Sequence, residues 1–66
     1  MNDYCMFIEN YNEVFSEDGK IKVCGREACK RLIETAYEIN PNVDYGNKQT
    51  GFMNVESLKA LKASLI

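Results

Sequence analysis

The 66-residue sequence predicts a single small α+β domain, residues 1–66, with three short helices and a two-stranded β-ribbon. Two observations carry this prediction. Three segments have apolar residues at helical spacing, and two short segments that each follow a Gly alternate polar and apolar residues. At this length folding hides only about 60 % of the surface of the unfolded chain, so we expect a compact fold of modest stability.

The first helix is expected within the first fifteen residues, with Asp3 as its N-cap. Apolar side chains recur there on one helical face: Tyr4, Phe7, Ile8, Tyr11, Val14 and Phe15. A competing interpretation makes residues 4–8 a strand and joins residues 14–17 to 20–23 through the Asp18-Gly19 turn, a recognised hairpin signal. We favour the helix because six periodic positions outweigh one turn dipeptide.

The second helix is expected over residues 26–39, after a short strand at residues 20–23 and a break at Gly25. Its apolar stripe is Cys29, Leu32, Ile33, Ala36 and Ile39. Opposite charges spaced four residues apart predict the ion pairs Glu27–Arg31 and Lys30–Glu34 on the solvent side. Asn40-Pro41 ends the helix, because Pro disfavours helical geometry in the residue before it.

The third helix is expected after Asn54, a good N-cap residue, with Lys59 and Lys62 facing solvent. Its apolar face is Val55, Leu58, Leu61 and Leu65. Residues 41–51 are rich in turn formers and predict an exposed loop with a brief strand at residues 43–45. Residues 18–23 and 50–55 share the pattern x-Gly-x-apolar-x-Val, so their two short strands are candidates to pair.

The composition excludes most catalytic chemistry, because the chain has no His and therefore lacks the commonest general base and metal ligand. We expect no enzyme activity and no cofactor. Three cysteines are an odd number, which indicates reduced thiols and a cytoplasmic location. No stretch is apolar enough to cross a membrane, and Asp3 is acidic where a signal peptide would be basic.

Two short patterns are candidates for metal binding, and neither has a complete set of ligands. With Gly19 or Gly51 at position 6 of a calcium loop, only Asp18 is a strong ligand among the expected positions. Cys24 and Cys29 lack the spacing of a zinc pair and have no second pair. We therefore expect no metal. Thiol chemistry at Cys24, which precedes a predicted helix start, is an alternative that has no base to activate it.

Charge is unevenly distributed along the chain. Residues 1–19 hold five carboxylates and no Lys or Arg, whereas residues 20–66 hold eight basic and five acidic side chains, a net charge of +3. An acidic helix that carries aromatic side chains suits docking to another protein. The sequence therefore predicts a non-catalytic interaction or regulatory module of inhibitor or adaptor type, with a homo-oligomer left open. The candidate partner-binding residues are Glu9, Tyr11, Glu13, Glu17 and Asp18.

Nucleic-acid binding is the alternative function. It would use residues 41–53 as a wing beside a helix. The basic residues available for such a face are Arg26, Lys30, Arg31, Lys48, Lys59 and Lys62. Glu27, Glu34 and Glu38 intervene on the same helix, and a net charge of +3 is small for binding driven by phosphate contacts. Protein binding is therefore the favoured function.

Overall fold

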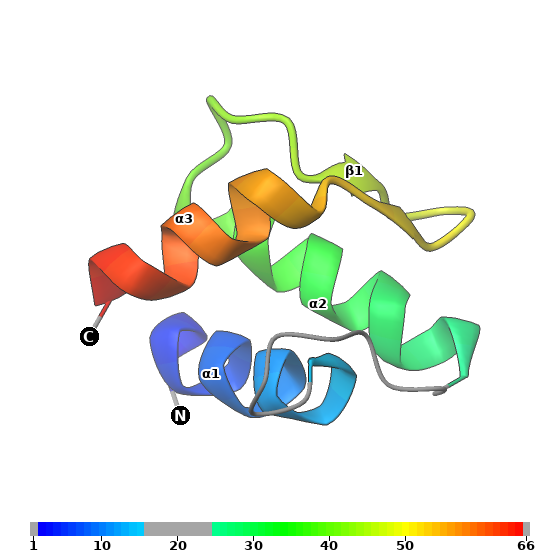
Figure 1. The fold of residues 1–66 in the computed structure, drawn as a ribbon, viewed down its shortest axis with the longest axis horizontal. Helices are drawn as coiled ribbons and strands as arrows, with labels where there is room; N and C mark the ends of the chain where they lie inside the picture. Colours follow the sequence, from blue (N-terminus) through cyan, green and yellow to red (C-terminus); the bar gives the residue numbers. More distant parts are fainter. Residues whose placement is uncertain (1, 16–24, 66) are drawn as a thin grey trace.

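A computed structural model describes residues 2–15 and 25–65, which form three helices and one β-hairpin. The order along the chain is α1 (Asp3–Val14), α2 (Arg26–Ile39), β1 (Gly46–Asn47), β2 (Phe52–Met53) and α3 (Val55–Leu65) (Figure 1). The predicted α+β class with three helices and a two-stranded ribbon is confirmed. The predicted strand at residues 20–23 and the Asp18-Gly19 turn lie outside the described residues.

Helix α1 confirms the helical interpretation of the first segment, and the alternative strand at residues 4–8 is wrong. The N-cap is Asn2 and not Asp3, because the Asn2 side-chain oxygen accepts the Cys5 N–H at 2.9 Å. Asp3 is instead the first helical residue, where its negative charge favours the positive end of the helix dipole. Tyr4 is 53 % exposed, so the buried stripe begins one turn later, at Phe7.

Helix α2 has the predicted bounds and lies between α1 on one side and the hairpin on the other (Figure 1). Leu32, Ile33 and Ala36 are fully buried, as the stripe predicts. They form the centre of a core that also takes Phe7, Tyr11, Val14 and Phe15 from the first segment and Leu58 and Leu61 from α3. The core therefore joins all three helices.

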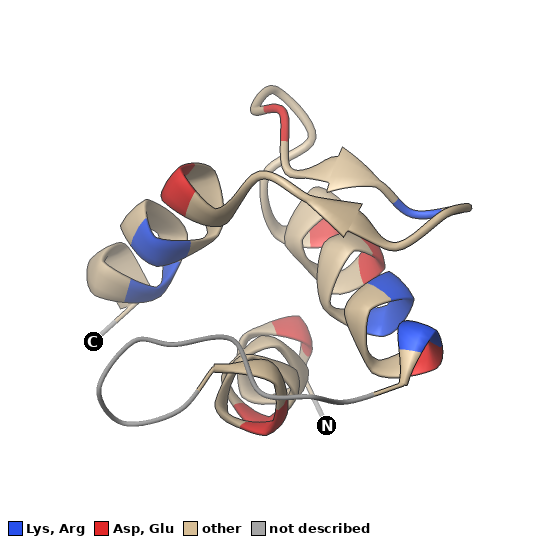
Figure 2. Cartoon of the chain, turned by 45° about the vertical axis from the view of Figure 1, so that its right-hand side comes forward, with Lys and Arg blue, Asp and Glu red and all other residues tan. Residues whose placement is uncertain are grey.

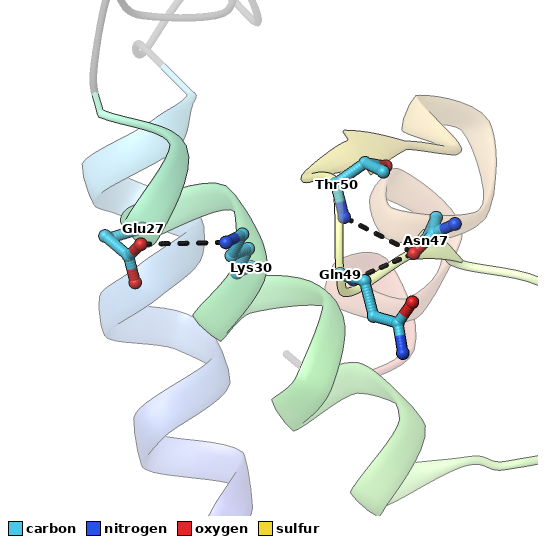
Figure 3. A network of polar contacts seen from close by, with 5 residues as sticks. All are labelled: Glu27, Lys30, Asn47, Gln49 and Thr50. Atoms are coloured by element: carbon cyan, nitrogen blue, oxygen red, sulfur yellow. Dashed lines mark hydrogen bonds and ion pairs between the residues drawn. The ribbon is translucent and has the colours of Figure 1, made fainter.

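The ion pairs of α2 differ from the predicted spacing. Lys30 Nζ lies 3.7 Å from Glu27 Oε1, one position closer in sequence than expected (Figure 3). Arg31 Nη2 lies 3.7 Å from Glu13 Oε2 of α1. The packing of α1 against α2 brings Glu13 within reach of Arg31, and periodicity within α2 gives no sign of that neighbour.

One strand of the ribbon, β2, lies within the predicted segment 50–55, but its partner is β1 (Gly46–Asn47), which was not predicted as a strand. β1 and β2 are antiparallel, with Gly46 opposite Met53 and Asn47 opposite Phe52. The Asn47 side-chain oxygen accepts the N–H groups of Gln49 and Thr50 at 2.8 and 3.4 Å, which fixes the connecting turn (Figure 3). Gly46 has φ +113°, and a Cβ there would collide with the Phe52 carbonyl oxygen, so a glycine is required where the ribbon begins.

The segment before the ribbon is not an exposed loop throughout, and the brief strand predicted at residues 43–45 is absent. Tyr45 is only 1 % exposed and its ring packs edge-on against Tyr37, with 5.5 Å between ring centroids. Burial raises the pKa of Tyr45, and a hydrogen bond with the Asn40 side chain partly offsets that rise. The turn-forming composition of residues 41–51 gave no indication that Tyr45 belongs to the core.

Helix α3 begins after Asn54, whose side-chain oxygen accepts the Ser57 N–H at 3.4 Å, so the predicted N-cap is confirmed. Leu58 and Leu61 are buried and Lys59 is exposed, as expected. Lys62 is half-buried, so its expected exposure is only partial. Its Nζ lies 3.2 Å from Asn12 Oδ1 and 4.4 Å from the centroid of the Tyr11 ring, because α3 packs beside α1.

Among the helices described, none combines the length and the apolar character needed to cross a bilayer.

Candidate functional site

The outward face of α1 carries two carboxylates, Glu9 and Glu13, one turn apart and exposed. Figure 2 shows acidic and no basic segments on this helix. The Glu13 side chain is 57 % exposed and its partner Arg31 is 62 % exposed, so water screens their 3.7 Å pair strongly. Among the residues that the structure describes, Glu9 has no Lys or Arg nitrogen within 4.0 Å. Its charge is therefore available to a partner.

An open groove of about 360 Å³ lies beside Glu9, between the start of α1 and the end of α3. Its apolar lining comes from Tyr4 and Ile8 of α1 and Leu65 of α3, with Cys5 between them. Asn2 and Glu9 supply polar edges. Figure 1 shows the start of α1 and the end of α3 at the same end of the molecule. The groove and the Glu9 carboxylate thus form one surface.

The residues that the sequence predicted as partner contacts differ in their exposure. Glu9 and Glu13 are exposed, as a contact role needs. Tyr11 is only 6 % exposed and its ring stacks on Phe15 with 4.3 Å between centroids, so in this structure it is part of the core. Burial also raises the pKa of Tyr11. Glu17 and Asp18 lie outside the described residues.

Three residues of this surface were not predicted as contact residues: Tyr4, Ile8 and Leu65. The periodicity of α1 placed Tyr4 and Ile8 in the core, because a periodic stripe does not say where the neighbouring helix ends. Leu65 comes from the other end of the sequence and reaches the groove only through the packing of α3 beside α1. No local signal in the sequence marks this juxtaposition.

The basic residues do not form one face. Figure 2 shows basic segments on α3 on one side and at the start of α2, with one on the hairpin turn, on the other. The hairpin turn contacts the start of α2, where a Cβ at Gly51 would lie 3.0 Å from Arg26 Cγ. Phe52, next to that turn, is 78 % exposed. The hairpin therefore carries one exposed aromatic ring, and the residue before it in the chain, Gly51, packs against Arg26.

Cys5 is an exposed cysteine that lines the groove, Cys29 is half-buried, and Cys24 lies outside the described residues. Within residues 2–15 and 25–65, no three Cys, Asp or Glu side chains gather as a metal site requires.

Comparison of the chain with protein-family models, with curated proteins and with solved structures found no match in any of the three. We therefore infer its function from its own residues.

Proposed function

We propose that this domain is a non-catalytic protein-interaction module, of inhibitor or adaptor type, that docks a protein partner through the outer surface of α1 in the cytoplasm. One observation carries the proposal: the Glu9 carboxylate, which has no ion pair within residues 2–15 and 25–65, lies at the edge of an open apolar groove. Apolar contacts in such a groove supply affinity, and a charge at the rim steers encounter and fixes orientation.

The chemistry of this surface suits binding better than catalysis. Glu9 and Glu13 are exposed, and no His is available anywhere in the chain to act with them as a general acid or base. Two water-exposed carboxylates on one helix face still attract a basic partner surface, with a strength that depends on salt.

The test is affinity capture from the source cells, followed by association-rate measurements on each protein retained. The double variant Glu9→Lys, Glu13→Lys should slow association while the thermal midpoint changes little, because both side chains lie outside the core. The matched control is Lys48→Glu with Lys59→Glu, two exposed residues outside α1. Lys30 and Lys62 are unsuitable controls because each contacts a neighbouring residue.

The proposal fails if the lysine reversals abolish capture and the glutamate reversals do not. It also fails if every retained protein binds both double variants at the rate of the unmodified domain.

Nucleic-acid binding is the second candidate, and the exposed Phe52 on the hairpin, which also carries Lys48 and packs through Gly51 against Arg26, is the observation that favours it. An exposed aromatic ring offers a stacking surface to an unpaired base, and nearby cations attract phosphates. Binding of a single-stranded oligonucleotide that falls steeply with salt and is lost in Phe52→Ala would support this candidate over the first.

A further inference from the structure

We infer that the groove between α1 and α3 receives a short peptide segment in which large apolar side chains are flanked by Lys or Arg. This inference rests on the proposed function and names the chemistry of the partner. Its basis is the juxtaposition of an apolar lining from Tyr4, Ile8 and Leu65 with the Glu9 carboxylate at the rim.

The apolar lining of the groove indicates that the bound peptide presents a large apolar side chain. Tyr4 is 53 % exposed and Ile8 and Leu65 are partly buried, so each keeps apolar surface in contact with water. Covering that surface with an aliphatic or aromatic side chain removes it from water, which is the main source of affinity at protein interfaces. The groove is open and not enclosed, so it suits a side chain presented by a larger molecule.

The negative charge around the groove indicates that Lys or Arg flanks the apolar side chain of the peptide. Residues 2–15 carry three carboxylates, Asp3, Glu9 and Glu13, and no Lys or Arg. Lys62 is the basic residue of α3 nearest in sequence to Leu65, and its Nζ is directed to Tyr11 and Asn12, one turn of α1 beyond Ile8. A basic residue beside the apolar anchor would meet Glu9, which lines the groove, whereas Glu13 is not one of the residues that line the groove and lies 3.7 Å from Arg31.

The probe for the test is a capped short peptide in which leucines are flanked by arginines, added to the isotope-labelled full chain. Saturable amide chemical-shift changes are expected at the groove residues Tyr4, Cys5, Ile8, Glu9 and Leu65. Replacing the leucines of the peptide by serine should abolish these changes. Replacing its arginines by glutamate should weaken binding, because attraction to Glu9 becomes repulsion. This loss should be larger than the gain in affinity of the arginine peptide when salt is removed.

Matched variants of the chain separate the groove from the rest of α1. Glu9→Gln should weaken peptide binding about two- to fivefold, whereas Glu13→Gln, with the same loss of charge, should change it less. Tyr4→Ser should weaken binding at least about fivefold. Met6→Ser, which removes another exposed apolar side chain of α1 from outside the groove, should not. Unchanged amide spectra away from the mutated residue would establish that each variant is folded.

Several outcomes would overturn the inference. The inference is wrong if no amide shifts appear at millimolar peptide, if the shifts centre on other residues, or if the serine peptide binds equally well. It is also wrong if the groove amides shift when only the protein concentration is raised, because the occupant is then a second copy of the chain. If binding of a captured partner depends on Glu9 and Glu13 but is unchanged by Tyr4→Ser, the proposed interaction function is supported and the inferred peptide in the groove is wrong. If the peptide binds the groove but no captured protein depends on α1, the proposed function is wrong and the groove chemistry stands.

Discussion

At the scale of single residues, the Tyr37 hydroxyl is the group that holds residues 44–46 in place. It accepts the Tyr45 N–H at 3.2 Å and lies 2.8 Å from the Gly46 carbonyl oxygen and 3.3 Å from Asp44 Oδ1. A phenol has one hydrogen to donate, and the shorter distance favours the Gly46 carbonyl. Asp44 Oδ1 also accepts the Gly46 N–H at 3.0 Å. One side chain of α2 thereby sets the start of β1.

Tyr37→Phe should lower the free energy of unfolding by about 1–3 kcal/mol, because it leaves the part-buried Tyr45 N–H and Gly46 carbonyl without this partner. Urea denaturation measures the change. Tyr4→Phe removes the same atom from a side chain that is 53 % exposed and serves as the control. A cost below about 0.5 kcal/mol for Tyr37→Phe, the range of ordinary surface changes, would show that the hydroxyl does not hold the segment.

At the scale of elements, α2 packs against α1 and the hairpin, and its apolar stripe makes the strongest stability prediction. Leu32→Ala should lower the free energy of unfolding by about 2–5 kcal/mol, because Leu32 is fully buried and its loss leaves a cavity. A loss of that size approaches the whole stability of a small domain. Chemical denaturation, or circular dichroism if the variant does not fold, reports the loss.

Glu34→Ala is the matched control on the exposed side of α2 and should change stability by less than about 0.5 kcal/mol. Equal effects of Glu34→Ala and Leu32→Ala would show that the helix does not bury the face described.

At the scale of the whole molecule, two buried phenols make stability depend on alkaline pH. Burial raises the pKa of Tyr11 and of Tyr45, so the folded state keeps protons that the unfolded chain releases above about pH 10. The stabilisation is therefore complete below about pH 10 and is lost as pH rises through the raised pKa values. Urea denaturation at a series of alkaline pH values should show the decline.

The double variant Tyr11→Phe, Tyr45→Phe should show a shallower decline than the unmodified chain, since it lacks both shifted groups while every lysine and thiol is kept. Parallel declines in the two proteins would contradict an origin in these phenols.

Metal ions should not affect the stability of the molecule. The chain has no His, and the described residues bring no three acidic or thiol side chains together. Addition of Ca²⁺ or Zn²⁺, followed by a chelator, should leave the thermal midpoint unchanged. A metal-dependent rise in the midpoint would contradict the prediction, because a ligand that binds only the folded state stabilises it.

The sequence by itself determined the helices, because their signals are local. The stripe around Leu32 and Ile33 and the Asn40-Pro41 stop gave the bounds of α2, and Asn54 gave the start of α3. It also determined the acidic character of the first segment, since charge is read directly from composition. The role of Glu9 and Glu13 in binding stays a prediction.

Only the tertiary structure decided which strand pairs with β2, that Tyr45 is buried, and which apolar side chains lie near Glu9. The ribbon depends on Gly46 at φ +113° and on the hydroxyl of Tyr37 from another element, and neither is visible in local alternation. Tyr4 and Tyr11 share the periodic pattern of one helix, yet one is exposed and the other buried, because burial depends on where α2 and α3 cover α1. Leu65 and Ile8 line the same groove only in the folded chain, so the groove is a property of packing between segments far apart in the sequence.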